Sequence, residues 1–510
     1  AFEHFFTNTP SDSGMAFVLV QHLDPTHPSI LGELVRRYTR MQVKEIQDGM
    51  EIKPDTAFII PPNCDMGIIN GKFQLMEPVA PRGLRLPIDY FFRSMAEDQK
   101  ERAICIILSG TGTDGTLGLK EIKGAGGMAM VQDPDTAKYD GMPRSAIGSG
   151  LVDYILPPQK MPEQLIAYVK HAMSKQPNKT AKPIPKADDL FQKIFMLLRA
   201  QTGQDFSHYK QNTIVRRIER RMTVHQIARL SDYVRYLQES PIEVNTLFKE
   251  LLIGVTNFFR DLDAFEALKK KVIPRLIERA MPDGPLRVWV PGCSTGEEAY
   301  SIAMLIAEQL DSTRNELQVQ IVGADIDSDA IESARSGIYP DSIVRDVPSE
   351  YMERFFAKEE NSFHVKKSIR DWIVFSRQNL AFDPPFSRID LISCRNVLIY
   401  MGGELQQRVF PLFHYALSEE GALFLGTSET IGGFTSYFDT VDRKWKLYQK
   451  KKGSPAQALH MDLPIPTPTR SDFGYQLPTD QSSAKKTSYR QLTEGMILRE
   501  FGPTAVLVNE

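Results

Sequence analysis

The pattern of apolar and polar positions predicts alternating strands and helices over residues 1–175. Short apolar runs of strand length alternate with segments of helical period. Asn70-Gly71, placed between two short runs, predicts a hairpin turn. We therefore expect a parallel or mixed sheet flanked by helices. The expected strands lie at residues 17–21, 57–61, 102–108 and 128–132, and the expected helices near 28–38, 87–98, 116–124 and 161–174.

The pattern changes twice further along the chain. A polar segment with three prolines, 176–189, predicts a flexible linker. Residues 190–269 have a helical period throughout, and from 270 to 452 strand and helix patterns alternate again. The fold class expected is α/β: two doubly wound Rossmann-like α/β domains separated by a small all-α subdomain. The strands expected in the second α/β domain lie at 286–290, 317–322, 372–375, 389–393 and 421–425.

The tail, residues 453–510, is rich in Pro, Ser and Thr up to about residue 491, which predicts a disordered linker. Its last residues, 504–510, form a strand-like run that resembles the opening strand of a PAS-type sensory domain.

Composition narrows the class of protein. Lys and Arg number 61 against 64 Asp and Glu, which argues against a general nucleic-acid binder. The four cysteines (Cys64, Cys105, Cys293 and Cys394) are scattered, so we expect neither a disulfide framework nor a metal site, and a cytoplasmic location fits. No apolar run is long enough to span a bilayer, so we expect no membrane insertion.

A glycine-punctuated turn at residues 292–296 is the strongest candidate for a ligand site. It follows a predicted strand and precedes a predicted helix, an arrangement that brings backbone amides close to a ligand. No Lys-Ser or Lys-Thr follows Gly296, so the turn is not a P-loop, and the third glycine of a dinucleotide fingerprint is missing. Glu297 and Glu298 would repel a pyrophosphate but welcome a cationic ligand such as S-adenosylmethionine.

Asp325 completes this candidate site. It ends the next predicted strand, where α/β proteins place an acid that binds ribose hydroxyls. An ordinary turn carboxylate is the alternative interpretation.

Two polar residues at strand ends mark a second candidate site. His22 follows the strand at 17–21, and Asp114 follows the strand at 102–108. A base and its orienting acid in a serine hydrolase have this relation. Alternatively, His22 is a polar loop residue and Asp114 caps the following helix.

Four segments around these residues resemble the catalytic domain of the chemotaxis receptor methylesterases (CheB type): VQHLDP (20–25), IIPP (59–62), LSGTGTDG (108–115) and GMPRSA (141–146). The resemblance covers nearly all of residues 1–175. It implies that His22 is the general base, that Asp114 orients it, and that Thr111 lies near the oxyanion, although that position commonly holds Met in the family.

The nucleophilic serine of that family sits upstream of the segment that resembles Ala1-Phe2. Ser11 and Ser13 lack the strand–turn–helix context of an exposed nucleophile. We therefore expect the chain to start inside the domain and to lack esterase activity as printed. Residues that precede Ala1 and end in a Ser-rich glycine turn would restore it.

The helical segment holds two further features. Arg216, Arg217, Arg220 and Arg221 form a dense arginine face, which is either simply solvated or a docking surface for a glutamate-rich partner. Residues 256–261 (TNFFRD) would suit a lid with aromatic walls and one cation, or else a helix end packed on the next domain.

Five ordered segments resemble the chemotaxis receptor glutamate methyltransferases (CheR type): TNFFRD (256–261), the glycine turn with Glu297-Glu298, ADID (324–327), RQNL (377–380) and CRNVLIY (394–400). The resemblance covers residues 190–452 and implies a Rossmann-like methyltransferase whose partners are the cytoplasmic helices of methyl-accepting chemoreceptors. Gly254 departs from it, because some relatives carry an Asn there that touches the cofactor. The S-adenosylmethionine contacts that it implies are Thr256, Arg260, Glu298, Asp325, Asn379, Leu380, Cys394 and Arg395.

Methylation of a glutamate carboxylate is chemically compatible with these residues. A glutamate carboxylate is ionised at neutral pH, because its pKa is about 4.3, so its methylation needs no general base. Arg260 and Tyr400 are the candidates for holding that carboxylate. The leading hypothesis is receptor glutamate O-methylation with an attached glutamyl ester hydrolase domain; the alternatives are a nicotinamide-dependent oxidoreductase and a non-catalytic signalling scaffold.

Overall fold

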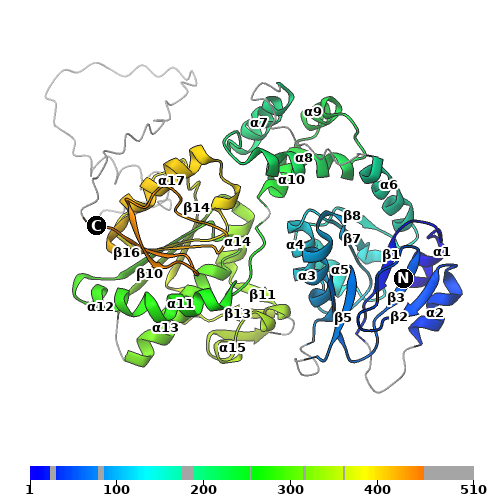
Figure 1. The fold of residues 1–510 in the computed structure, drawn as a ribbon, viewed down its shortest axis with the longest axis horizontal. Coiled ribbons are helices and arrows are strands. Elements are labelled where there is room, and N and C mark those ends of the chain that lie inside the picture. Colours follow the sequence, from blue (N-terminus) through cyan, green and yellow to red (C-terminus); the bar gives the residue numbers. More distant parts are fainter. Residues whose placement is uncertain are drawn as a thin grey trace, which may run out of the picture. The chain divides into compact units, whose positions relative to one another are not determined.

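The computed structural model describes residues 1–22, 30–78, 85–174, 189–252, 254–313, 317–359 and 362–452. The predicted tail at 453–510, and the predicted linker apart from its last residue, lie outside the described residues. Strands and helices alternate in the first and last parts of the described chain, and helices alone lie between them (Figure 1). The predicted fold class is confirmed.

The first region contains short parallel sheets. One has the order β1-β3-β2 and another the order β6-β7-β8, and all their strand pairs are parallel. The predicted hairpin is present, because Asn70 and Gly71 adopt φ angles of 52° and 73° between antiparallel strands. The strands are β1 (Ala16–Leu19), β2 (Gln42–Glu45), β3 (Thr56–Ile59), β4 (Asp65–Ile69), β5 (Lys72–Met76), β6 (Ile104–Ile107), β7 (Met128–Gln132) and β8 (Tyr154–Leu156).

Helices cover these sheets. The buried side chains of α3 and α4 share one apolar cluster with β6 and β7, so the sheet and its helices form a common core. The helices are α1 (Phe2–Thr7), α2 (Leu31–Tyr38), α3 (Pro87–Gln99), η1 (Lys100–Arg102), α4 (Thr116–Gly124), η2 (Pro134–Thr136), α5 (Gly141–Gly148) and α6 (Met161–Ser174).

The middle region is helical, as predicted, with its own apolar cluster. It contains α7 (Asp189–Thr202), α8 (Gln211–Val224), α9 (Leu230–Glu239) and α10 (Pro241–Leu251).

The arginine face of α8 corrects a prediction. Arg217, Arg220 and Arg221 are only 3%, 7% and 5% exposed, so the expectation of an exposed docking surface is wrong at these three positions. Only Arg216 reaches the surface, where it lies 3.3 Å from Glu101. The polar pattern of α8 did not reveal that these arginines are buried and paired with carboxylates from other parts of the chain.

Those carboxylates come partly from the first region. Arg220 lies 2.5 Å from Asp153 and 2.9 Å from Glu250. Lys123, at the end of α4, pairs with the same two acids at 2.8 and 3.2 Å. All four side chains are nearly inaccessible, so opposite charges are matched inside the protein, where an unpaired charge is costly.

The last region is built on a seven-stranded sheet with the order β14-β10-β9-β15-β16-β18-β17. Its first five strands are parallel, and the β18 and β17 edge is antiparallel. A separate antiparallel sheet, β11-β13-β12, was not predicted. The strands are β9 (Leu286–Pro291), β10 (Val319–Asp325), β11 (Ile338–Pro340), β12 (Phe356–Glu359), β13 (Ser362–Val365), β14 (Ile373–Arg377), β15 (Ile389–Cys394), β16 (Leu417–Leu425), β17 (Phe438–Asp442) and β18 (Leu447–Lys450).

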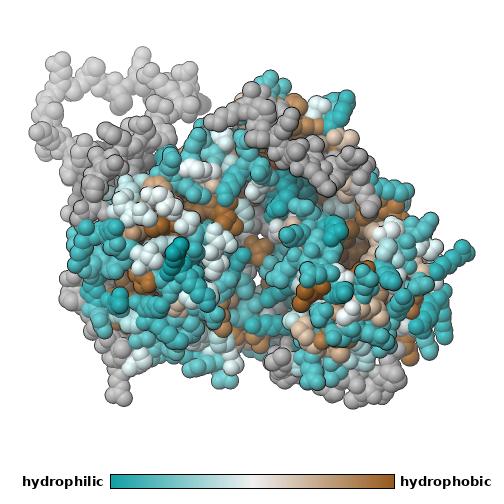
Figure 2. Space-filling view, in the orientation of Figure 1, coloured by the Kyte–Doolittle hydropathy of each residue, from teal (hydrophilic) through white to brown (hydrophobic). Residues whose placement is uncertain are grey.

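Both faces of this sheet are covered. Val288 and Val290 of β9 belong to one apolar cluster with α11 to α14, and Trp289 between them belongs to a second cluster with α17. Figure 2 shows mostly hydrophilic residues on the visible face, with small separate hydrophobic areas. The helices are α11 (Leu262–Lys271), α12 (Ile273–Asp283), α13 (Glu297–Thr313), α14 (Ser328–Ser336), η3 (Asp341–Arg345), α15 (Ser349–Phe355), α16 (Lys367–Arg370), η4 (Leu398–Tyr400) and α17 (Gly403–Ala416).

Candidate functional site

The glycine turn between β9 and α13 forms the floor of the candidate site. The amides of Gly292 and Cys293 donate to the carbonyl of Ala324 in β10, at 2.7 and 3.0 Å. Gly292 has φ 72°, and a Cβ there would lie 2.3 Å from a methyl carbon of Val397. Only glycine fits this position, so the turn lies close against the segment that follows β15.

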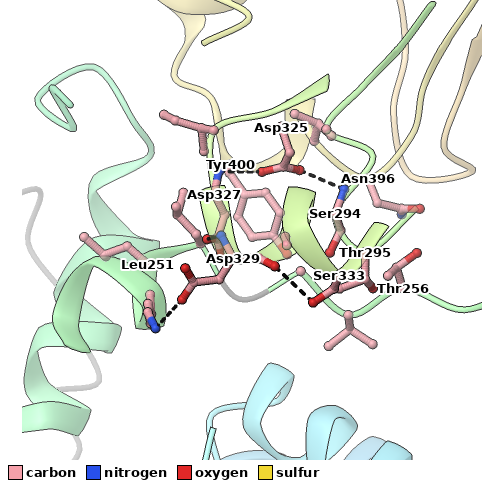
Figure 3. A pocket seen from close by; sticks show the side chains of 18 of the residues that line it. Leu251, Thr256, Ser294, Thr295, Asp325, Asp327, Asp329, Ser333, Asn396 and Tyr400 are labelled. Carbon is pink, nitrogen blue, oxygen red and sulfur yellow. Dashed lines mark hydrogen bonds and ion pairs between the residues drawn. The ribbon is translucent and has the colours of Figure 1, made fainter. Parts of the chain in front are cut away.

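Asp325 ends β10 beside this turn. Its Oδ2 accepts from the amide of Ser294 at 2.8 Å, and its Oδ1 accepts from the amide of Asp327 at 3.0 Å (Figure 3). Burial raises the pKa of Asp325. A carboxylate has about four acceptor positions, so some acceptor capacity remains for ligand hydroxyl groups.

The two glutamates that open α13 differ in their surroundings. Thr295 donates its hydroxyl to Glu297, which is 5% exposed and does not line the cavity. Glu298 does line it, and its Oε1 accepts from the Ser393 hydroxyl at 2.6 Å. Burial raises the pKa of Glu298 to about 7, although Arg395 and Ser393 both favour its ionised form.

Arg395 is held on several sides. Its guanidinium lies 4.9 and 4.6 Å from the ring centres of Phe265 and Phe424, and it pairs with Asp261 at 2.8 Å. Its Nη1 lies 3.8 Å from Glu298. The buried Nε and Nη1 atoms donate to no partner among the described residues, so this cation has unused hydrogen-bonding capacity beside the cavity.

The Thr256–Asp261 segment contributes Thr256 and Arg260 to the cavity. Arg260 donates from Nη1 to the carbonyl of Val255 at 2.5 Å. Phe258 and Phe259 are 1% and 3% exposed and pack in the core of the last region, so the expectation of aromatic lid walls is wrong. The segment packs on the next domain, as in the alternative, but as a turn before α11 and not as the end of a helix.

Asn379 and Tyr400 join the cavity to the helical region. Asn379 donates from Nδ2 to Gln204 at 2.6 Å, and the Tyr400 carbonyl accepts from the amide of Lys210 at 2.9 Å. Leu380 lines the cavity between these contacts. The Cys394 side chain is fully buried in a core cluster and does not line the cavity, so any ligand contact there would come from its backbone.

Together these residues surround a cavity of about 410 Å³ at the carboxyl ends of β9, β10 and β15. Of the eight predicted cofactor residues, all but Cys394 line it, and Tyr400 does as well. Figure 3 shows Thr256, Asp325, Asn396 and Tyr400 around this space. Gly254 also lines it, and a Cβ there would lie 2.9 Å from the Ser294 hydroxyl, so the turn leaves little room for the larger residue of some relatives.

Part of the cavity wall was not predicted. Lys120 of α4 and the 147–151 segment, which includes the end of α5, line it from the first region, and Tyr209 and Lys249 line it from the helical region. Lys249 pairs with Asp329 at 2.6 Å across this wall. Residues that are so far apart along the chain share no local pattern, so no sequence signal indicated these contacts.

Two further contacts hold the first region beside the cavity. Arg93 of α3 makes a bidentate ion pair with Asp346, at 2.9 and 3.1 Å. At Gly124, an added Cβ would lie 2.3 Å from a methyl carbon of Val255, which neighbours Thr256. Close packing therefore extends up to the edge of the cavity.

The second candidate site lies in the first region. His22 Nε2 lies 2.9 Å from Asp114 Oδ2, so the structure brings the two predicted residues together. Asp114 is 3% exposed and also accepts from the amides of Ile88 and Asp89, whereas the His22 side chain is 51% exposed. Burial and the neighbouring Asp114 raise the pKa of Asp89 above its ordinary value.

The other predicted positions near this pair are less defined. Thr111 is exposed in the turn after β6. Ser11 and Ser13 lie in the turn between α1 and β1, and no serine in the described part of the chain hydrogen-bonds to His22.

Two kinds of feature are absent from the described residues. No described helix combines the length and the apolar character that crossing a membrane requires. Over the same residues, no three His, Cys, Asp or Glu side chains are grouped so that they could hold a metal ion.

Three family models match the chain. CheB methylesterase matches residues 1–165, the all-alpha domain of CheR methyltransferase matches 189–252, and its SAM binding domain matches 254–447. The domain bounds expected from the sequence, which differ slightly from these, stay predictions.

Curated relatives agree with these matches. The chain is 37% identical over 467 residues to an uncharacterized 104.1 kDa protein of Rhodobacter capsulatus; this match covers 87% of the chain but only 49% of the relative, so the chain spans about half of that protein's length. A putative methyltransferase Cher3 of Pseudomonas putida is 35% identical, covering 47% of this chain and 87% of that one. A chemotaxis protein methyltransferase of Borreliella burgdorferi is 29% identical, covering 51% and 95%.

Among solved structures, the catalytic domain of Thermotoga maritima CheB methylesterase is similar, with 33% identity and a TM-score of 0.31. The match covers 32% of this chain and 89% of that domain.

Proposed function

Because the chain belongs to the chemotaxis protein methyltransferase family and carries a CheB methylesterase domain ahead of the methyltransferase domains, we propose that it methylates glutamate side chains of chemoreceptors, using S-adenosylmethionine. The observation that supports this most directly is the cavity in which Glu298, Asp325 and Arg395 meet. We propose that this reaction takes place in the cytoplasm, where the expected partners, the signalling helices of the receptors, lie.

The residues of the cavity fit this cofactor. S-adenosylmethionine supplies a methyl group on a sulfonium, and it also carries an ammonium, a carboxylate and a ribose. Glu298 offers a carboxylate to the ammonium, and Asp325 has free acceptor positions for the ribose hydroxyls. The unused donors of Arg395 and the cation of Arg260 suit a carboxylate. Thr256, Asn379, Leu380 and the backbone at Cys394 complete the proposed contacts.

The protein's part in the reaction is placement. The acceptor glutamate is already ionised at neutral pH, so none of the cavity residues has to remove a proton. Arg260 and Tyr400 both line the cavity, and we assign them to orient the acceptor carboxylate. Holding two reacting groups in line can supply about 7–11 kcal/mol of the barrier reduction.

Residues 1–165 have a different proposed role. His22 serves as the general base of glutamyl methyl ester hydrolysis, and Asp114 orients its ring; the 2.9 Å contact between them supports this assignment. Thr111 is proposed to lie near the developing oxyanion. Hydrolysis by this mechanism also needs a serine nucleophile.

Arg260→Ala tests the methyltransferase proposal. We expect transfer to fall by on the order of 10²- to 10³-fold, because one cation that faces the reacting carboxylate is removed. The assay incubates membranes that carry chemoreceptors with methyl-labelled S-adenosylmethionine and measures the methanol that base releases from glutamyl esters. The matched control is Arg229→Ala, which removes an exposed arginine paired with Asp232.

Wild-type turnover in Arg260→Ala would remove Arg260 from the mechanism. No base-labile methyl group in the wild-type reaction would favour the non-catalytic scaffold. The nicotinamide alternative is tested by calorimetry with S-adenosylhomocysteine and with NAD, of which only the first is expected to bind.

A further inference from the structure

Glu429 is a buried carboxylate in the loop after β16. It is 4% exposed, and its two oxygens accept from three backbone amides. Oε2 accepts from Asn396 at 2.9 Å and from Gly426 at 2.8 Å, and Oε1 accepts from Ile399 at 3.3 Å. None of the ion pairs found among the described residues includes Glu429, so backbone amides are what stabilise its charge.

Two of these amides belong to the turn that carries Tyr400. Asn396 begins this turn with φ 60°, a left-handed conformation that is uncommon for residues other than glycine. Val397 packs against Gly292 of the glycine turn. The hydrogen bonds to Glu429 therefore stabilise a backbone conformation, between the cofactor cavity and Tyr400, that would be unfavourable without them.

The other end of the turn is held by the helical region. The Tyr400 carbonyl accepts from Lys210, and the amide of Gly402 donates to the carbonyl of His208 at 3.1 Å. On the sheet side, the hydrogen bonds to Glu429 hold the same turn. Without them, only the contacts with the helical region would hold the backbone of Tyr400 in place.

We propose that Glu429 is a positioning residue for methyl transfer, which acts by holding residues 396–400 so that Tyr400 faces the acceptor carboxylate. This inference rests on the proposed function. It predicts a specific pattern: slower transfer with the cofactor still bound, because Glu429 does not line the cavity.

Glu429→Gln keeps the size of the side chain but puts an NH₂ group where a carboxylate oxygen now accepts from the backbone. We expect kcat to fall by about 10- to 100-fold, the range that one or two charge-assisted hydrogen bonds can cover. The dissociation constant of S-adenosylhomocysteine, measured by calorimetry at pH 8, should stay within about threefold of wild type, because Glu429 does not line the cavity. The measurement is made at pH 8, where Glu298 is ionised, because the charge of Glu429 contributes to the raised pKa of Glu298.

Hydrogen exchange gives a readout that does not depend on activity. In Glu429→Gln the amides of Asn396 and Ile399 should exchange faster, with no change in β9 and β10. Glu419→Gln, which alters an exposed acid of β16, is the matched control and should match wild type in both measurements. If Glu429→Gln does not fold, Glu429→Asp keeps the charge and should show the same pattern with a smaller loss of rate.

A double-mutant cycle with Tyr400→Phe decides whether Glu429 acts through Tyr400. If it does, adding Glu429→Gln to Tyr400→Phe should cost less than about threefold. A severe loss in Tyr400→Phe with fully additive losses in the double variant overturns this inference alone. Wild-type turnover in Tyr400→Phe overturns the role proposed for Tyr400 and this inference with it, and wild-type turnover in Glu429→Gln overturns only the latter.

Discussion

The two candidate sites both lie at the carboxyl ends of parallel strands, but they differ in how far their titratable side chains are buried. In the first region one buried acid, Asp114, faces a histidine whose ring is half exposed. In the last region, Glu298, Asp325 and Arg395 are drawn together around a cavity, and burial raises the pKa of both acids. A general base has to exchange protons with its surroundings, and a half-exposed ring can do so. The attraction between charged side chains and a charged cofactor is stronger where water is excluded.

The largest effect is expected at Asp153, where the first region meets the helical region. Burial alone would raise the pKa of Asp153, but Arg220 and Lys123 hold it below its ordinary value. Asp153→Ala removes one acid and leaves these cations partly unpaired, so we expect the free energy of unfolding to fall by about 3–5 kcal/mol. Denaturant unfolding followed by far-UV circular dichroism, which reports on the helices of every region, measures this loss.

Asp232→Ala is the control for Asp153→Ala, because Asp232 forms exposed pairs with Arg229 and Arg235, and exposed ion pairs contribute little to stability. The depressed pKa of Asp153 implies that its contribution is present above the pKa of the unfolded chain, about 3.9, and is lost as the pH falls further. Equal losses in both variants would contradict the buried network.

A smaller effect, on the affinity for the cofactor, is expected at Glu298, which is more deeply buried than the histidine of the other candidate site. With a pKa of about 7, the Glu298 carboxyl is protonated below neutral pH in the ligand-free protein. Since an ammonium binds the ionised form, the affinity for S-adenosylhomocysteine should fall toward tenfold per pH unit below pH 7. Calorimetry at pH 8, 7 and 6 measures this slope.

Glu298→Gln should bind more weakly at pH 8 and lose the slope. Parallel pH profiles for the two proteins would exclude Glu298 as the ammonium partner. The sign for stability is the opposite of that at Asp153: because the pKa of Glu298 is raised, its ionisation destabilises the ligand-free protein as the pH rises from about 4.3 toward 7.

The smallest effect is expected at His22. His22→Ala changes a half-exposed side chain that does not line the cofactor cavity, so methyl transfer should stay within about twofold of wild type. The base-labile methanol assay measures this. A larger change would mean that the two sites are coupled.

Local structure followed the sequence prediction well, because it depends on short-range patterns, and most of the residues predicted to contact the cofactor lie around one cavity. The helix at 116–124 and the strand at 128–132 have the predicted bounds, and Asp325 lies beside the glycine turn as expected. The antiparallel β11-β13-β12 sheet was missed, since three strands of three or four residues give almost no periodic signal.

The errors share one physical cause. A polar pattern such as the arginines of α8 shows that a helix face is charged, but not whether water or distant carboxylates solvate it. The same holds for Phe258 and Phe259, whose apolar character suited a lid as well as a core. Partners that are distant along the chain decide each case.

Gly124 is a simple example of a residue whose surroundings depend on a partner that is distant along the chain. The space beside its Cα is smaller than a methyl group, because Val255 already fills it, and its carbonyl accepts from Arg217 at 3.0 Å. A side chain at position 124 of this chain would therefore require Val255, or the segment that carries it, to shift away from the end of α4. The absence of a side chain at one residue thus sets how closely the CheB methylesterase domain packs against the start of the SAM binding domain.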